Sequence, residues 1–289
     1  MIQGQRARAS IVIPAHNEAA TITSVLRIFS EEAGPAEFEV VVACNGCTDD
    51  TARIASGFAG VTVVDIAQPS KIAALNAGDA AATAFPRIYL DADIAVTLDS
   101  LRAVVAALEN HAPAAAPLPV LDTHHCSLGS RAYFSVFSRL GYVRRHLIGA
   151  GVYGLSESGR RRFGKFPDVI ADDAYVYGLF QDEERFNPPG ATFTIRVPRT
   201  LRAIYRRQVR MTLGNLQLKA MGHPVSAPLP NWQRVLRANP RLIPAGVLYT
   251  AVQGFALLHA RWLLRRRAVG AWNRDETSRS QPPGGGALH

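Results

Sequence analysis

The sequence predicts an α/β fold with a mostly parallel central sheet flanked by helices, followed by a helical, basic C-terminal region. Three observations support this prediction. Over residues 9–100, short apolar runs alternate with segments of helical periodicity, which is typical of βαβ units. Polar clusters follow several of these runs directly, at the strand ends where parallel sheets bind ligands. After Arg185 the chain is rich in arginine and contains one long apolar run.

The elements of the first hundred residues follow from the spacing of apolar side chains. Unbroken β-branched runs predict buried strands, and apolar residues three or four apart predict helices. The expected strands are residues 9–14, 38–43, 61–66 and 87–90. The expected helices are residues 18–32, 48–58, 72–83 and 101–110, the second of them capped by Thr48 or Asp49.

The second half of the chain contains longer helical patterns. Proline-flanked residues 114–120 predict an edge strand, and a glycine-rich turn at 149–154 leads into a short strand. Residues 242–260 are almost wholly apolar and approach the ~20 residues that cross a bilayer. Gln253 and His259 interrupt this run, and flanking arginines suit a helix that lies at a charged interface. Whether it spans, lies on or avoids a membrane is left open. The other expected helices are residues 131–145, 172–180 and 198–221.

Charge is divided unevenly along the 289 residues, whose net charge is +9. Up to Glu184 there are 15 Lys/Arg and 21 Asp/Glu, whereas residues 185–274 contain 16 basic residues and no acidic one. Such asymmetry indicates an anionic partner for the C-terminal third. Because the arginines flank an apolar run, an anionic membrane surface is expected to bind through residues 201–267, and nucleic acid is not.

The N-terminus and the cysteines indicate a reducing compartment. The first ten residues are too short and polar for a signal peptide. Cys44, Cys47 and Cys126 are odd in number and lack a second pair at zinc spacing, so Cys44 and Cys47 are interpreted as packed small residues. His124 and His125 are interpreted as a loop pair. The expectation is a cytoplasmic protein, peripheral at the inner face of the membrane.

Two carboxylates, Asp91 and Asp93, follow the strand expected at residues 87–90. Alternate residues of an extended segment point to the same side, so both can face one point beyond the strand end. Two hard oxygen ligands beside a phosphate-bearing substrate suit Mg²⁺ or Mn²⁺, with diphosphate oxygens and water completing the shell. For this pair alone, a solvated turn that caps the next helix is the alternative.

Four motifs in this order resemble those of the family 2 glycosyltransferases of the GT-A fold. They are Pro14-Ala-His16-Asn17-Glu18, Asn45-Gly-Cys-Thr-Asp49-Asp-Thr, Lys71-x-x-Ala-Leu-Asn76-Ala-Gly78 and Asp91-Ala92-Asp93. Each is weak alone, but the set is specific, and the resemblance covers about residues 10–210. It implies an inverting enzyme that transfers a sugar from a nucleotide sugar to an acceptor hydroxyl.

The resemblance also implies which residues bind the donor and the metal. A divalent cation, Mn²⁺ or Mg²⁺, is implied at Asp93 and Asp91. The family commonly has Asp where Asn45 stands, reading the uracil imide; Asn still offers an acceptor and a donor, so UDP is favoured, with GDP and dTDP less easily excluded. The implied donor-binding residues are Pro14, His16, Asn17, Glu18, Asn45, Asp49, Lys71, Asn76, Asp91, Ala92, Arg206, Arg207 and Arg210.

Asp172 and Asp173 stand where the family has its acidic pair. Inverting transfer requires a base that takes the acceptor proton. Asp173 is assigned as that base and Asp172 as its like-charged neighbour, the alternative being a pair that caps the following helix.

The arginines of residues 198–221 stand where the family often has a Gln/Arg helix beside the diphosphate. Arginine suits bidentate phosphate contacts, and a basic helix resting on anionic lipid is the alternative. The Q-x-x-R-W pattern of processive synthases is absent, which favours transfer of a single sugar.

The expected organisation has three parts. Residues 1–200 form the catalytic domain, with a nucleotide-sugar half at about 9–100 and an acceptor half at about 101–200. Residues 201–272 form a helical basic region that associates with membrane or is accessory, and residues 273–289 a disordered tail. The sugar, the linkage and the acceptor, with a lipid-linked one in view, stay open. A sugar nucleotidylyltransferase-like enzyme and a basic nucleic-acid-binding protein are the alternatives.

Overall fold

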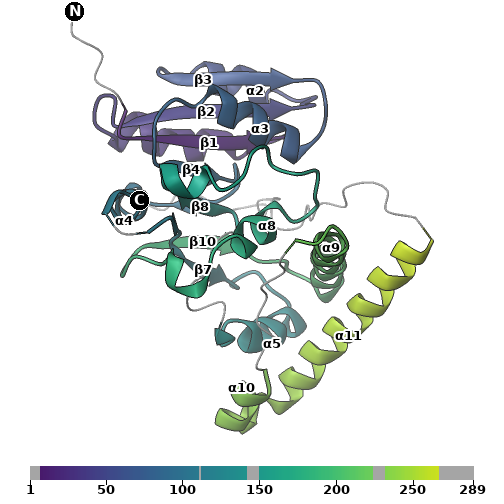
Figure 1. Ribbon diagram of the computed structural model, residues 1–289. Coiled ribbons are helices and arrows are strands. Elements are labelled where there is room, and N and C mark those ends of the chain that lie inside the picture. The colour runs from purple at the N-terminus through teal and green to yellow at the C-terminus, as the bar shows by residue number, and fades with distance from the viewer. Residues whose placement is uncertain (1–6, 111, 142–149, 224–231, 267–289) are drawn as a thin grey trace, which may run out of the picture.

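The computed structural model describes residues 7–110, 112–141, 150–223 and 232–266. Within them, a larger sheet has the strand order β3-β2-β1-β4-β8-β6-β9 and a smaller sheet the order β5-β10-β7 (Figure 1). Strands β3, β2, β1 and β4 run parallel to one another, and β8 joins them antiparallel. The predicted α/β class with a mostly parallel central sheet is confirmed.

Strands β1 to β4 and β8 lie close to the predicted strands, whereas β5, β9 and β10 were not predicted. Those of the larger sheet are β1 (Ala9–Ala15), β2 (Phe38–Asn45), β3 (Val61–Ile66), β4 (Arg87–Leu90), β6 (Ala114–Ala115), β8 (Val152–Leu155) and β9 (Arg185–Phe186). Those of the smaller sheet are β5 (Ala95–Val96), β7 (Leu118–Asp122) and β10 (Thr192–Arg196).

The helices follow in chain order. They are α1 (Ile22–Arg27), α2 (Thr51–Ser56), α3 (Lys71–Ala81), α4 (Leu98–Asn110), α5 (Leu128–Phe137), α7 (Glu157–Arg160), α8 (Asp172–Gly178), α9 (Leu201–Ala220), α10 (Trp232–Ala238) and α11 (Ile243–Arg265). The other helical elements are the π-helix η1 (Ile28–Glu32) and the 3₁₀ helices η2 (Asp182–Glu184) and η3 (Pro240–Leu242).

Strand β1 lies at the centre of the larger sheet and is buried along its whole length, which explains its unbroken apolar run. Its alternate residues enter two separate clusters. Ile11 and Ile13 face α1, α2 and α4, whereas Val12 faces α3. Helix α3 approaches closely because Gly78 has no side chain: a Cβ there would lie 2.6 Å from Val12 Cγ1. The N-terminus of α3 is thereby held at the strand ends.

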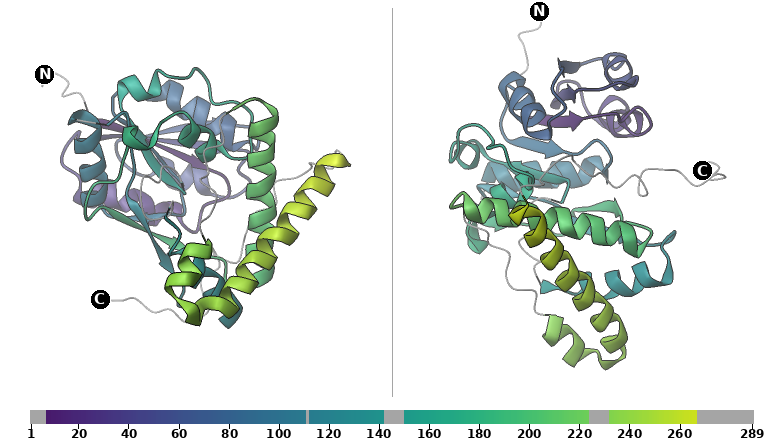
Figure 2. Two further views of the ribbon diagram at one scale, coloured as in Figure 1. Left: turned by 60° about the horizontal axis from the view of Figure 1, so that its bottom comes forward. Right: turned by 90° about the vertical axis from the view of Figure 1, so that its right-hand side faces the viewer.

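The C-terminal helices form a group beside the second sheet. Helix α11 packs on α9 and α5, with Tyr249, Ala256 and Ala260 buried in the contact. Viewed from that side, α11 crosses in front of α9 (Figure 2, right). The long arginine-rich helix α9 is therefore covered on one side by α11.

Several predicted boundaries were wrong. Helix α1 begins at Ile22 rather than at residue 18, because the loop before it is occupied by hydrogen bonds to the loop after β2. Helix α2 begins at Thr51 with Asp50 at its cap position. The single edge strand predicted at 114–120 is two strands in different sheets, β6 and β7, and only β7 lies at an edge.

Parts of other predictions lie outside the described residues. These are Gly149 of the glycine-rich turn, residues 142–145 of the predicted helix, Arg267, and the tail at 273–289.

Candidate active site

Acidic side chains from two elements meet one lysine beyond the end of β4. Lys71, the first residue of α3, has its Nζ 2.9 Å from Asp91 Oδ1 and 3.3 Å from Asp172 Oδ2. Asp172 is the first residue of α8, followed by Asp173. We call Asp91, Asp172 and Asp173 the acid cluster. The lysine thus joins the strand end, α3 and α8, three segments that are far apart in sequence.

Burial and mutual repulsion shape the electrostatics of this group. The pKa of Asp172 is raised to about 6 and that of Asp91 is also raised, chiefly because burial disfavours the charged carboxylate. Burial alone would lower the pKa of Lys71, but the attraction of the acid cluster outweighs it and raises that pKa. Three carboxylates face one ammonium, so the group favours a further cation. The side chains of Lys71 and Asp91 remain 26% and 33% exposed, which leaves them within reach of a ligand.

The glycine-rich turn before β8 closes against the acid cluster. Ala150 donates its N–H to Asp173 Oδ2 at 3.3 Å, and the Gly151 carbonyl accepts from the Asp91 N–H at 2.8 Å. Gly151 has φ +105°, and a Cβ there would lie 2.7 Å from the Ile94 side chain. The turn therefore needs glycine, both for its backbone conformation and for its close approach to the acidic segment.

Helix α9 brings arginine to the same place. Burial lowers the pKa of Arg210, and so does its neighbour Arg207. All three carboxylates of the acid cluster act in the opposite direction, so the Arg210 guanidinium lies within electrostatic reach of them. Arg206 is exposed on the same helix. Arg210 is thus the predicted arginine whose pKa responds to the acid cluster.

The predicted base-binding residues lie at the ends of β1 and β2. Asn45 is buried and donates its Nδ2 to the Ala15 carbonyl at 2.7 Å, while its Oδ1 accepts no hydrogen bond from the described residues. His16 Nδ1 contacts the Asn45 carbonyl. Pro14 lies within β1, one residue before Ala15. At this strand end, the Oδ1 of Asn45 is thus an acceptor that the described residues leave unused.

Three other predicted residues hold the loops after β1 and β2 together. Asn17, with φ +52°, accepts at Oδ1 from the Thr48 N–H at 2.8 Å. Asp49 accepts from the Ala19 N–H at 3.1 Å. Glu18, which is buried, donates its N–H to the Thr51 hydroxyl at 2.7 Å and accepts from the Thr21 hydroxyl at 2.9 Å. These bonds fix the wall of the nucleotide half, and any direct contact of these side chains with the donor stays a prediction.

Asn76, on α3, has a different set of partners. Its Nδ2 donates to the Phe166 carbonyl at 3.1 Å, and its Oδ1 accepts from the Phe166 N–H at 2.8 Å. This pair of bonds anchors the segment that leads to α8. The predicted contact of Asn76 with the donor therefore stays untested.

Sequence reasoning missed a buried ionic cluster centred on Asp79. The guanidiniums of Arg87 and Arg160 each lie 2.6 Å from its carboxylate, and the Tyr89 hydroxyl donates to it at 2.6 Å. Tyr89 also stacks on Tyr153, with ring centroids 5.0 Å apart. The available signal was strand periodicity, because Tyr89 lies two residues before Asp91 and so shares its side of β4.

Tyr153, on β8, is a second residue that sequence reasoning missed. Its hydroxyl is buried and makes no hydrogen bond within the described part of the chain. Burial raises its pKa, and the acid cluster raises it further. The carboxylates of the acid cluster therefore act electrostatically on this hydroxyl.

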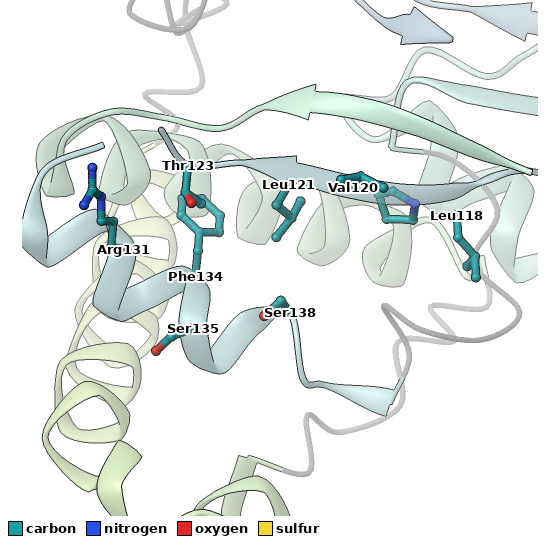
Figure 3. Close-up of a pocket in the computed structure, with 9 residues that line it drawn as sticks. Leu118, Val120, Leu121, Thr123, Arg131, Phe134, Ser135 and Ser138 are labelled. Atoms are coloured by element: carbon teal, nitrogen blue, oxygen red, sulfur yellow. The ribbon is translucent and has the colours of Figure 1, made fainter. Parts of the chain in front are cut away.

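A cavity of about 520 Å³ lies elsewhere, between β7 and α5 (Figure 3). Its walls are mostly apolar, with three hydroxyls and one cation, Arg131. It shares no lining residue with the acid cluster or with the predicted donor site. The lining residues are Leu118, Pro119, Val120, Leu121, Thr123, Arg131, Phe134, Ser135 and Ser138.

The two carboxylates after β4 suit a metal ion whose remaining coordination positions are filled by a bound ligand. Among the described residues, no group of three His, Cys, Asp or Glu side chains could hold a metal by itself. Asp91 and Asp93 supply two carboxylates, and Mg²⁺ or Mn²⁺ commonly completes such a pair with phosphate oxygens and water. His124 and His125 are exposed beyond β7, as predicted for a loop pair.

Comparisons with known proteins agree with this geometry. Residues 10–146 match the family model of glycosyl transferase family 2. A mannosyltransferase from Pyrobaculum calidifontis, solved with GDP-mannose and Mn²⁺, is 21% identical with a TM-score of 0.59, over 93% of this chain and 77% of that one. Among curated proteins no relative matches the chain.

A second enzyme shares the fold. Glucosyl-3-phosphoglycerate synthase from Mycobacterium tuberculosis, solved with Mn²⁺, UDP and glucosyl-3-phosphoglycerate, is 22% identical with a TM-score of 0.53, over 76% of this chain and 82% of that one. The same enzyme with Mg²⁺ and UDP gives 21% and 0.53, over 76% and 81%. These likenesses show the fold. The family match over residues 10–146 confirms the resemblance to the family 2 glycosyltransferases.

Proposed function

We propose that the protein transfers a single sugar, with inversion, from a nucleotide sugar to an acceptor hydroxyl. The observation that carries this proposal is the convergence of Lys71, Asp91 and Asp172 at the end of β4, in a chain whose N-terminal half matches family 2. The similar structures include complexes with GDP-mannose and Mn²⁺, with UDP and Mn²⁺, and with UDP and Mg²⁺.

The donor diphosphate is held at the acid cluster. Asp91 and Asp93 would bind Mn²⁺ or Mg²⁺ together with the diphosphate oxygens. When bound, the cation neutralises the charge that grows on the departing nucleoside diphosphate. Lys71 and Arg210 add positive charge from the protein on the same side.

The catalytic base of the proposed reaction is one of the two carboxylates at the start of α8. Because Asp172 is 7% exposed and paired with Lys71, it is poorly placed to take a proton from an acceptor. Asp173 is more exposed, and the Ala150 N–H orients its carboxylate. We therefore propose that Asp173 is the base that removes the proton of the acceptor hydroxyl as the new bond forms.

The nucleobase of the nucleotide sugar is held at the end of β2. The unused Oδ1 of Asn45 can accept from a ring N–H beside a carbonyl, either the imide N–H of uracil and thymine or the lactam N–H of guanine. A UDP-sugar is favoured because of the family resemblance, and the acceptor half is expected within residues 101–200.

The products distinguish this reaction from that of a nucleotidylyltransferase. The protein is incubated with UDP-, GDP- and dTDP-sugars, Mn²⁺ and a panel of acceptors. Release of a free nucleoside diphosphate is the expected result. Release of pyrophosphate, or conversion of none of the three donors, would contradict the proposal.

A further inference from the structure

Helix α11 has two faces of different character. One face, with Tyr249, Ala256 and Ala260, is buried against α9 and α5. The opposite face carries large apolar side chains that recur at helical spacing and are exposed. We call it the outer face of α11: Ile243 (53% exposed), Val247 (64%), Phe255 (65%), Leu258 (63%) and Trp262 (46%).

The polar residues of α11 turn toward the protein. Gln253 donates to the Tyr249 hydroxyl at 2.8 Å, and His259 Nδ1 shares a hydrogen bond with the Tyr205 hydroxyl of α9 at 2.9 Å. The two groups that interrupt the apolar run are therefore satisfied inside the molecule. The outer face is left apolar over most of its length.

Arginines complete the outer face at its C-terminal end. Arg261 and Arg265 follow Leu258 by three and seven residues, so they share its side of the helix, and both are exposed. The Arg266 guanidinium lies over the Trp262 ring at 4.4 Å. No acidic residue lies between Arg185 and Arg274, so the charged side chains of α9, α10 and α11 are all positive.

We propose that the outer face of α11 docks the protein flat on an anionic lipid bilayer. The apolar side chains enter the acyl boundary while the arginines reach lipid phosphates, as in interfacial amphipathic helices. The anionic cytoplasmic leaflet supplies the matching charge. A docked enzyme would meet acceptor hydroxyls carried by membrane lipids.

Crossing the bilayer would require α11 to leave the protein. By length and composition alone, Pro240–Arg265 could cross a membrane. However, its inner face is held to α9, the helix that carries Arg210. An ordinary core helix is also excluded, because only 22% of its most apolar window is buried. If α11 lies in the membrane interface, its inner face stays on α9 and its outer face is buried in lipid.

The experiment is co-sedimentation of the full chain with phosphatidylglycerol or phosphatidylcholine vesicles at low salt. The variant Phe255→Gln/Leu258→Gln/Trp262→Gln removes the apolar contact and keeps good helix formers. The control Leu128→Gln/Met221→Gln alters two exposed apolar residues elsewhere, 83% and 48% exposed. Wild type and control should pellet with phosphatidylglycerol, and the triple variant should bind at least about tenfold more weakly.

A second variant, Arg261→Gln/Arg265→Gln, tests the charge separately. It should reduce the preference for phosphatidylglycerol and the salt dependence of binding. The proposal is overturned if wild type stays in the supernatant, or if the folded triple variant pellets as well as wild type. A wild-type dimer in light scattering that the triple variant abolishes would assign the face to a second copy instead. Because vesicle binding needs no donor, its result is independent of the sugar-transfer assay.

Discussion

At the scale of single residues, Lys71 determines how the site receives a cation. Its amine already neutralises part of Asp91 and Asp172, so it competes with a divalent cation for the same carboxylates. Lys71→Met should therefore raise the affinity of the nucleotide-free protein for Mn²⁺ and lower its affinity for the donor. Isothermal titration measures both affinities. An unchanged Mn²⁺ affinity would show that the lysine and the metal do not share a site.

Asp93 should be essential for the metal-dependent reaction. Asp93→Ala removes one of the two carboxylates that follow β4, and transition-state stabilisation of several kcal/mol should be lost with it. We expect turnover to fall on the order of 10³-fold, with an unchanged circular dichroism spectrum. If the wild-type enzyme keeps full activity in EDTA, the assignment is wrong.

Substitutions of Asp173 and of Asp172 should have different kinetic effects. Asp173→Asn preserves shape and removes the proton acceptor, so turnover should fall by ~10²–10⁴ with little change in donor affinity. Asp172→Asn should act mainly on donor binding, because it loosens Lys71. A dead Asp172→Asn beside an active Asp173→Asn would reverse the two roles.

At the scale of elements, the Asp79 cluster connects α3 to β4 and α7. Arg160→Met leaves the buried Asp79 with one cation fewer and should lower the free energy of unfolding by about 2–3 kcal/mol. Arg161→Met is the matched control: its pair with Glu157 is exposed, so the loss should stay below about 1 kcal/mol. Urea unfolding measures both. Equal losses would mean that the cluster contributes no more than a surface pair.

The elements also show what sequence could predict and why. Strands β1 and β2 were predicted because their β-branched runs are buried on both faces, whereas the run of β3 is partly exposed. The second sheet was not predicted, because β5 has only two residues and β7 contains a proline. Neither strand shows enough alternation to be recognised in the sequence. The resemblance supplied the motif residues, but not Asp79 or Tyr153, whose roles depend on strands that pair only in the fold.

At the scale of the whole molecule, the site lies where the nucleotide half meets the rest of the chain. β4 and α3 belong to the predicted nucleotide half, whereas α8 and the Gly151 turn belong to the acceptor half, and β8 joins both in one sheet. Helix α9 then connects Arg210 to α11. This arrangement connects the proposed donor site, near the middle of α9, to a basic, apolar surface beside it.

The most direct measurement of the central claim is the binding of UDP with and without Mn²⁺, followed by thermal unfolding. The account predicts that UDP stabilises wild type only when Mn²⁺ is present. At about 100 times the dissociation constant the gain should be about 2.7 kcal/mol. Asp93→Ala should show no such gain. If UDP, GDP and dTDP stabilise wild type no better with Mn²⁺ than with EDTA, the end of β4 is not a metal-dependent donor site.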